Sequence, residues 1–469
     1  MRTDTIAAIA TALSEAGIGI IRVSGPEAVS LVDHIFYNSA GLRKLSHKSS
    51  HTVSHGYIVD TKEGEDWKKG IVDEVLAVLM KAPHSYTGED TVEINCHGGV
   101  LLLQKVLQLV LSNGARLAEP GEFTKRAFLN GRMDLSQAEA VMDVIHSQSE
   151  MALSSSIEQL TGKLALVVRD LREQILYEVA FIESALDDPE HISLEGYEER
   201  LSLKCTFFID RIEKLIASFR DGRLMREGIQ TVILGRPNAG KSSLLNAILG
   251  EERAIVTQIP GTTRDILQET VSLRGITLHM IDTAGIRHTE DVVERIGVDR
   301  AREYAQKADL ILFVIDGSEL PDEREKEIIS FIGQKHVIVV INKTDLTTIV
   351  SEDQVHAFFP ERADIPIVRI SASSGAGLNL LGKEIEKLFF DGELKGNREA
   401  VITNLRHKEA LEEAGKSLLL VRQGLEAHMP EDFYSIDLMG AYTALGSIVG
   451  EEVGEDLVQE IFSKFCMGK

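Results

Sequence analysis

Cysteine is scarce in this sequence. Only Cys96, Cys205 and Cys466 occur among 469 residues, and they lie far apart. Their odd number and wide spacing offer no pattern of zinc ligands, and they suit a reducing compartment. The sequence therefore predicts a cytoplasmic protein without a structural zinc site.

Long apolar runs are also missing. No run approaches the roughly 18 residues that a membrane-spanning helix needs, so we expect no transmembrane helix and no membrane partner. The apolar run at residues 5–13 is short and is flanked by Asp4 and Glu15. It is typical of a strand rather than of a signal peptide.

Positive charge is in deficit. The chain has 50 Lys and Arg against 73 Asp and Glu, a formal net charge of −23. This balance argues against a broad surface that coats nucleic acid. If the substrate is a nucleic acid, a local basic patch or a partner protein has to hold it.

Residues 235–242 read GRPNAGKS and fit G-x-x-x-x-G-K-[ST], the phosphate-binding loop of nucleotide hydrolases. An apolar, β-branched run at 230–234 predicts a strand before the loop, and residues 242–249 predict a helix closed by Gly250. Glycines let backbone N–H groups turn toward an anion, and a helix N-terminus adds partial positive charge. We expect Lys241 to reach the β- and γ-phosphates and Ser242 to hold Mg²⁺; a structural turn is the alternative.

Three more motifs follow predicted strands in order: DTAG at 282–285, NKTD at 342–345 and SAS at 371–373. The first suits the Mg²⁺ shell and the γ-phosphate, and the last closes over the base. Asp345 accepts the two hydrogen bonds that the N1 and N2 edge of guanine offers. Adenine lacks both donors, which gives a discrimination of roughly 10⁴-fold. Together the four motifs predict a GTP-binding domain.

The hydrolytic residues depart from the usual pattern of GTPases. Ile286 stands where Ras-like enzymes carry the glutamine that orients the attacking water. Glu290, Asp291 and Glu294 are candidates to replace it, and spacing alone does not choose among them. A solvated acidic loop is the alternative.

Residues 261–265 read GTTRD and offer Thr263 as a second Mg²⁺ ligand. Asn238 places a neutral oxygen donor at the phosphate loop. Neutral oxygens suit a large monovalent cation such as K⁺, which neutralises developing charge where other GTPases use an arginine finger.

The regions around this domain have different patterns. Residues 1 to about 118 predict an α+β fold, with strands at 19–24, 72–80 and 91–96 and a helix at 100–111. Arg22 and Glu93 interrupt apolar strands. Either they face solvent or pair with each other, or they form a polar site on the sheet.

Beyond Pro120-Gly121 the apolar period becomes helical, and it returns after a linker at 391–398. Between these parts, residues near 226–390 alternate strands and helices, as in a mostly parallel sheet. We therefore predict one helical domain interrupted by the nucleotide domain, with its two halves packed together. The apolar stripes are Leu160, Leu164, Val167, Leu171, Ile175, Val179, Ile182 and Leu186; Leu201, Cys205, Phe208, Ile212, Leu215 and Phe219; and Leu457, Ile461 and Phe465.

The chain resembles the MnmE (TrmE) family of tRNA-modification GTPases over essentially all of its length. The resemblance is carried by GIGIIRVSG at 17–25, YTGED at 86–90, PGEFT at 120–124, AFLNGRMDL at 127–135 and FCMGK at 465–469. The GTPase motifs are shared with other families, but these flanking stretches and the tail are specific.

The resemblance implies a multidomain α/β protein. It would comprise an α+β folate-binding and dimerisation domain at 1–119, a discontinuous all-α domain at 120–225 and 391–469, and an inserted Ras-like P-loop GTPase domain at 226–390. It also implies a cytoplasmic homodimer that forms a heterotetramer with the FAD-dependent protein MnmG. With a folate one-carbon donor, 5-formyl-tetrahydrofolate or a relative, the complex modifies C5 of the wobble uridine of certain tRNAs.

The resemblance also places individual roles on this sequence. The folate contacts fall on Arg22, Glu93, Arg132 and Lys469, the K⁺ contacts on Asn238, Thr257, Ile259 and Thr262, and the Mg²⁺ contacts on Ser242 and Thr263. The water-orienting glutamate falls on Glu294, which with Lys241 and Cys466 completes the candidate catalytic residues. The predicted nucleotide and cation site comprises Asn238, Ala239, Gly240, Lys241, Ser242, Ser243, Thr257, Gln258, Ile259, Pro260, Gly261, Thr262, Thr263, Asp282, Thr283, Ala284, Gly285, Asn342, Lys343, Asp345, Ser371 and Ala372.

Two other functions are alternatives for a GTPase of this kind. A ribosome-assembly GTPase usually appends a basic RNA-binding module, but residues 401–469 hold 6 Lys and Arg against 12 Asp and Glu. A membrane-linked signalling GTPase lacks support from any lipidation site or basic amphipathic helix. Cys466 is a possible nucleophile toward uridine C6, although nothing adjacent in sequence lowers the pKa of its thiol.

Overall fold

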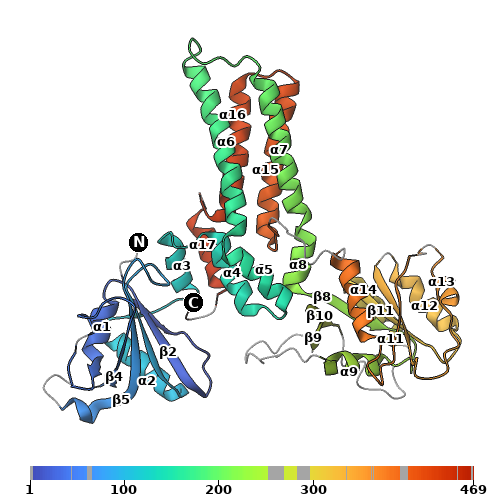
Figure 1. The fold of residues 1–469 in the computed structure, drawn as a ribbon, viewed down its shortest axis with the longest axis horizontal. Coiled ribbons are helices and arrows are strands. Elements are labelled where there is room, and N and C mark those ends of the chain that lie inside the picture. The colour runs from blue at the N-terminus through green and yellow to red at the C-terminus, as the bar shows by residue number, and fades with distance from the viewer. Residues whose placement is uncertain are drawn as a thin grey trace. The chain divides into compact units, whose positions relative to one another are not determined.

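The computed structural model describes residues 4–43, 45–60, 66–251, 269–281, 296–333, 335–360, 362, 364–390, 400–451, 453–465 and 468 (Figure 1). The chain divides into two compact units. The first holds Met1–Met142, Ala165–Leu176 and Tyr442–Lys469, and the second holds Asp143–Leu164 and Tyr177–Ala441. Within the described residues, none of the helices is long and apolar enough to cross a membrane.

The first unit is built on a seven-stranded sheet with the order β3-β4-β5-β6-β2-β1-β7. Two helices, α1 (Ala28–Ile35) and α2 (Val100–Ser112), bury their apolar faces in one core with this sheet. The antiparallel register of β2 and β6 puts Arg22 directly opposite Glu93. The strands are β1 Ile6–Ile9, β2 Ala16–Ser24, β3 Phe36–Asn38, β4 Thr52–Val59, β5 Ile71–Met80, β6 Thr91–Gly98 and β7 Arg116–Leu117. The predicted strands and helix of this region are confirmed.

A charged cluster joins the edge of this sheet to α3 (Glu122–Leu129). The buried Arg126 donates from Nη2 to Asp4 Oδ1 at 2.8 Å and to Glu122 Oε1 at 3.0 Å. Arg116 donates from Nη2 to the same Glu122 oxygen at 2.6 Å. Burial alone would raise the pKa of Glu122, but hydrogen bonds from Arg116, the Glu119 amide and Arg126 lower it below its ordinary value. The cluster therefore stabilises this unit only while Glu122 is ionised.

We expect Glu122→Ala to destabilise the first unit by about 2 kcal/mol, because the buried Arg126 loses one of its carboxylate partners. The single tryptophan of the chain, Trp67, lies in this unit and stacks on Tyr37 at 5.6 Å, so urea unfolding followed by its fluorescence reports on this unit alone.

A second variant of this residue, Glu122→Gln, tests the pH dependence. A lowered pKa in the folded state gives stability that is present above the unfolded pKa, near 4.3 for glutamate, and is lost as pH falls through the folded value. Wild type should therefore lose stability below about pH 4 more steeply than Glu122→Gln. The exposed Glu15 is the matched control, and a Glu15→Gln protein that behaves like Glu122→Gln would contradict the assignment.

The helical region is formed by two segments of the chain, residues 135–227 and 405–463. The helices are α4 Leu135–His146, α5 Glu150–Leu160, α6 Lys163–Asp187, α7 Tyr197–Ala217, α8 Phe219–Glu227, α15 Leu405–Glu426, α16 Glu431–Val449 and α17 Glu455–Ser463. In the second unit α7 and α15, which lie about 200 residues apart in the chain, pack side by side (Figure 1). The prediction that the two sequence halves pack together is thereby confirmed.

The predicted apolar stripes need several corrections, among them Val167, which is half-buried beside the buried Val168, and Phe219, which begins α8. Leu160 ends α5 rather than extending α6, because Gly162 takes a φ of +84° that breaks the helix. At the far end of α6, Leu186 is 41% exposed. On α17 the buried residues are Val458 and Phe462, whereas Leu457 is 37% exposed. The second stripe is correct from Leu201 to Leu215, and it buries Cys205 completely.

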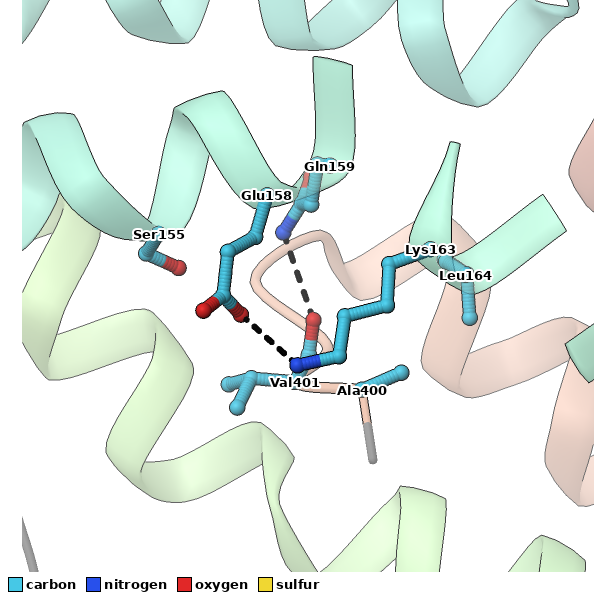
Figure 2. A pocket seen from close by; sticks show the side chains of 7 residues that line it. All are labelled: Ser155, Glu158, Gln159, Lys163, Leu164, Ala400 and Val401. Atoms are coloured by element: carbon cyan, nitrogen blue, oxygen red, sulfur yellow. Dashed lines mark hydrogen bonds and ion pairs between the residues drawn. The ribbon is translucent and has the colours of Figure 1, made fainter. Parts of the chain in front are cut away.

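The returning chain at residues 400–403 is tied to α5. Gln159 Nε2 donates to Val401 O at 3.3 Å and to Thr403 Oγ1 at 2.8 Å. Figure 2 shows the small pocket here, with Lys163 reaching Glu158 across it. Its volume of about 10 Å³ is close to the minimum for one water molecule, so it is no ligand site.

The second unit contains a six-stranded sheet with the order β13-β12-β11-β8-β10-β9. All neighbouring pairs are parallel except β9 with β10. One face packs on α9 and α14 and the other on α11, α12 and α13. The strands are β8 Ile229–Leu234, β9 Glu269–Leu273, β10 Ile276–Met280, β11 Leu310–Asp316, β12 His336–Asn342 and β13 Ile367–Arg369. The helices are α9 Lys241–Glu251, α11 Ile296–Lys307, α12 Glu323–Ile332, α13 Glu352–His356 and α14 Leu378–Phe390.

This arrangement confirms the multidomain α/β fold class. One detail was wrong, because Gly250 lies inside α9 and does not close it. Parallel strands end at a common edge, so the loops after β8, β11 and β12 meet there.

Candidate functional site

The loop between β8 and α9 has the backbone of a phosphate cradle. Gly235 and Gly240 have φ values of +152° and +94°. A Cβ at Gly235 would lie 2.3 Å from Val314 O, and one at Gly240 would lie 2.1 Å from Asn342 Nδ2. Both positions therefore require glycine. Asn238, also in the left-handed region at φ +62°, lies exposed between them.

Lys241 opens α9 and folds back over the loop. Its Nζ donates to Gly235 O and Arg236 O, each at 2.8 Å. Burial lowers its pKa to about 8. The ammonium thus lies at the helix N-terminus, inside the loop where an anionic oxygen is best stabilised. Ser242 and Ser243 follow it in the first turn of the helix.

Asn342, the last residue of β12, ties two loops together. Its Nδ2 donates to Ala239 O in the phosphate loop at 3.0 Å, and its Oδ1 accepts from the Ala372 amide at 3.1 Å. The side chain is buried and both of its polar atoms are used. One residue therefore fixes the phosphate loop relative to the loop at 371–373.

Asp345 and Ser371 stand together beside this bridge. Ser371 Oγ donates to Asp345 Oδ1 at 2.6 Å, and this hydrogen bond lowers the pKa of the Asp345 carboxyl. Asp345 is exposed, so its carboxylate remains available as a double acceptor. Lys343 has φ +62° and its Nζ bonds Asp316 Oδ2 at 2.6 Å, which joins the ends of β11 and β12.

A second polar group lies on the sheet of the first unit. Arg22 Nε donates to Glu93 Oε1 at 2.8 Å. The guanidinium of Arg22 lies 4.9 Å from the Tyr86 ring and 5.6 Å from the Phe123 ring, and that of Arg132 lies 5.1 Å from Tyr86. These distances are typical of cation–π contacts. Arg22 and Glu93 thus pair with each other, and they also belong to a charged and aromatic cluster.

The C-terminal tail reaches this cluster. Gly468 has φ +89°, and a Cβ there would lie 2.4 Å from Ile9 O in β1. Its carbonyl accepts a long hydrogen bond of 3.4 Å from Arg22 Nη1. The tail is anchored through α17, which packs on α3 where Phe462 lies 6.3 Å from Phe128.

Comparison with known proteins identifies the family of this chain. A family model described as the N-terminus of the GTP-binding protein TrmE matches residues 5–132, and the model of the MnmE helical domain matches residues 135–466. The chain is 53% identical over its full length, and over all of the relative, to the tRNA modification GTPase MnmE of Lachnoclostridium phytofermentans. The chain belongs to the MnmE family of tRNA modification GTPases.

Other comparisons are consistent with this membership. A second relative of the same name, from Geobacillus thermodenitrificans, is 47% identical over 99% of each chain. Among solved structures, the FeoB G-domain of Methanococcus jannaschii matches 34% of this chain and 97% of its own at 23% identity. The TM-score of this match is 0.25, which is too low to relate the two folds.

Several of the site residues predicted from the motifs and from the family resemblance lie outside the described part of the chain. They are Thr257, Gln258, Ile259, Pro260, Gly261, Thr262, Thr263, Asp282, Thr283, Ala284, Gly285, Glu294, Cys466 and Lys469. In the described residues no three His, Cys, Asp or Glu side chains form a metal-binding group. A Mg²⁺ ion held by hydroxyls and phosphates does not require one.

Sequence reasoning missed some contributors. Arg236, inside the phosphate loop, is 7% exposed and pairs with Glu319 at 2.6 Å and Glu325 at 3.2 Å, so it braces the loop from behind. Tyr86 and Phe123 lie in stretches that carried the family resemblance, but no role was given to them. Each is the single aromatic residue of a mostly polar motif, and this pattern could have indicated a role in the site.

The thiols of the two described cysteines are buried. Burial and the nearby Asp73 raise the pKa of Cys96 to about 12, and burial with Glu178 raises the pKa of Cys205 to about 12. Both thiols therefore stay protonated at neutral pH.

Proposed function

We propose that this protein binds and hydrolyses GTP and uses that activity in the modification of tRNA. The observation that carries the proposal is the Asn342 bridge, which holds a phosphate cradle and a guanine-accepting loop at one edge of one sheet. Family membership supports the same activity.

In this proposal each residue has a separate task. Lys241 neutralises charge on the β- and γ-phosphates, and the glycines of the loop let backbone N–H groups approach them. Glu294 orients the attacking water in place of the missing glutamine. Asn342 holds the two loops in register, so that the base and the phosphates are bound at a fixed separation.

Two cations complete the site. Ser242 and Thr263 are proposed to hold Mg²⁺, which when bound neutralises charge on the phosphate oxygens. Asn238, Thr257, Ile259 and Thr262 are proposed to hold K⁺. Ser242 and Asn238 are the cation-site residues that the structure describes, and both fit these roles. Ser242 lies in the first turn of α9, and Asn238 has an exposed, neutral amide in the phosphate loop.

The Asp345→Asn variant tests the nucleotide. It should bind GTP at least 10²-fold more weakly, because the carboxylate that accepted two hydrogen bonds from guanine is lost. It should gain affinity for xanthosine triphosphate, because the new amide offers a hydrogen-bond donor. Competition binding with both nucleotides measures this switch. Asp353→Asn, on exposed α13, is the matched control. Unchanged GTP affinity in Asp345→Asn would overturn the assignment.

We further propose that Arg22, Glu93, Arg132 and Lys469 bind a tetrahydrofolate one-carbon donor such as 5-formyl-tetrahydrofolate. The stacked guanidiniums around Tyr86 suit a planar ligand that carries carboxylates, and Glu93 suits the N–H groups of a pterin edge. With the FAD-dependent MnmG, the homodimer would add an aminomethyl-type group, carboxymethylaminomethyl, to C5 of uridine 34.

The proposed division of labour follows the domain boundaries expected from sequence. Residues 1–119 would bind folate and form the dimer, 120–225 and 391–469 would form the helical domain, and 226–390 would hydrolyse GTP in the cytoplasm. Binding of labelled tetrahydrofolate separates this function from that of a ribosome-assembly switch, which has no one-carbon chemistry. Nucleoside analysis of tRNA from a deletion strain tests the proposal as a whole.

A further inference from the structure

A cavity outside the nucleotide site lies in the second unit, between α8 and the start of strands β11 and β12. It has a volume of about 210 Å³. Arg220 and Arg223 of α8 line one side, and Asp309, Lys335 and His336 line the side of the sheet, with Phe389 of α14. The His336 and Phe389 rings lie 5.0 Å apart.

This cavity is distant from the GTP site. Asp309 and His336 stand at the amino ends of β11 and β12, whereas Asp316 and Asn342 stand at the carboxyl ends. Seven residues of strand separate the two edges by about 20 Å, at roughly 3.3 Å per residue. A ligand here would not touch the bound nucleotide.

Positive charge collects around the cavity. Among its lining residues, two arginines and one lysine oppose the single carboxylate of Asp309, which leaves a surplus of two. One oxygen of that carboxylate already accepts from the Gln230 amide at 3.1 Å. Arg220 Nη2 contacts His336 Nε2 at 2.7 Å, a pairing that leaves the guanidinium charge uncompensated.

The pKa of His336 is lowered by burial and by this excess of positive charge. Burial and the neighbouring cations Arg220, Arg362 and Lys335 lower the pKa of His336, and only Asp309 opposes them. Lys335 donates to Gln306 O and Ala308 O, so its ammonium is fixed in place beside the cavity.

We propose that this cavity binds a phosphate-group oxyanion that ties α8 to the base of the GTPase sheet. A dianionic phosphate matches the surplus of two charges, and guanidinium groups bind phosphate oxygens in bidentate fashion. The volume is about seven times the ~30 Å³ of a liquid water molecule, which leaves room for a phosphate group but is below the range of sites that enclose whole nucleotides.

Such a phosphate has two sources, inorganic phosphate and the backbone of a bound tRNA. The first goes beyond the proposed function, and the second rests on it. To test the first, the full chain is saturated with a nonhydrolysable GTP analogue, so that the β- and γ-phosphate positions of the loop are filled, and inorganic phosphate is titrated by calorimetry at constant ionic strength. We expect one site, weakened at least tenfold in the Arg220→Gln, Arg223→Gln double variant.

Arg200→Gln is the matched control, because Arg200 is exposed on α7 and does not line the cavity. Circular dichroism checks that the variants fold. The pKa of His336, followed by NMR, should rise when phosphate binds and should stay unchanged in the double variant.

The second source is tested by tRNA affinity at several salt concentrations. If the tRNA backbone supplies the phosphate, the double variant should bind more weakly, and the slope of log affinity against log salt should fall by about two. Phosphate binding that persists in the double variant, or no phosphate binding together with an unchanged tRNA slope, would overturn the proposal. GTP hydrolysis by the same variants should remain normal, so failure here is distinguishable from failure of the proposed function.

Discussion

Lys241→Ala should lower the rate of GTP hydrolysis by about 10³-fold, the effect expected when one preorganised donor to a developing charge is removed. The ammonium is fixed by Gly235 O and Arg236 O at 2.8 Å, within the loop that would surround the phosphates. The other cation of this loop, Arg236, is paired with Glu319 and Glu325, so the lost charge has no local substitute. Single-turnover hydrolysis measures the effect.

The pKa of Lys241 gives a second and sharper test. Burial lowers this pKa to about 8, and phosphate oxygens should raise it again in the complex. GTP binding should therefore take up about half a proton at pH 8. Affinity should be highest below about pH 8 and should fall as pH rises toward the pKa of the complex.

Calorimetry in buffers of different ionisation enthalpy measures this proton uptake. Lys241→Arg keeps the charge but should take up no proton, because arginine stays protonated at this pH. Lys214→Ala, which removes an exposed lysine of α7, should match wild type in both measurements. Equal proton uptake in wild type and Lys241→Arg would remove Lys241 from the linkage.

Local motifs were predictable because their chemistry is contained in a few adjacent residues. Strand β8, the glycine loop and α9 follow directly from the β-branched run, the GRPNAGKS spacing and the apolar residues behind it. Arg22 and Glu93 were also visible as charges inside apolar strands. The sequence left open whether these two charges face solvent or pair, or form a polar site. The register of β2 and β6 pairs Arg22 with Glu93 within a larger polar cluster.

Long-range contacts were not predictable. The partners of Asn342 lie 103 and 30 residues away in the chain, so no local pattern reveals its bridge. The prediction of the buried stripe on α17 was wrong for another reason. Positions 457, 461 and 465 and positions 458, 462 and 465 are both compatible with a helical period. The contact of Phe462 with Phe128 selects the second set.

Gly468→Ala should abolish tRNA modification while GTP hydrolysis stays near wild type. A Cβ at residue 468 would lie 2.4 Å from Ile9 O, and its φ of +89° is strained for alanine, so the tail has to leave β1. That movement withdraws the Gly468 carbonyl from Arg22. A displacement of about 1 Å is enough to cost 10²-fold in a reaction that depends on positioning.

Nucleoside analysis of tRNA, run beside an assay of GTP hydrolysis, separates the two activities. Deleting residues 466–469 should give the same result as Gly468→Ala, and Ser463→Ala, on the exposed side of α17, should change neither activity. Cys466→Ser then distinguishes chemistry from positioning. Folate binding that persists while modification is lost makes the thiol chemical, and modification that persists makes it structural. If Gly468→Ala and the deletion both leave modification intact, the tail has no part in the site, and Arg22 and Glu93 must act without it.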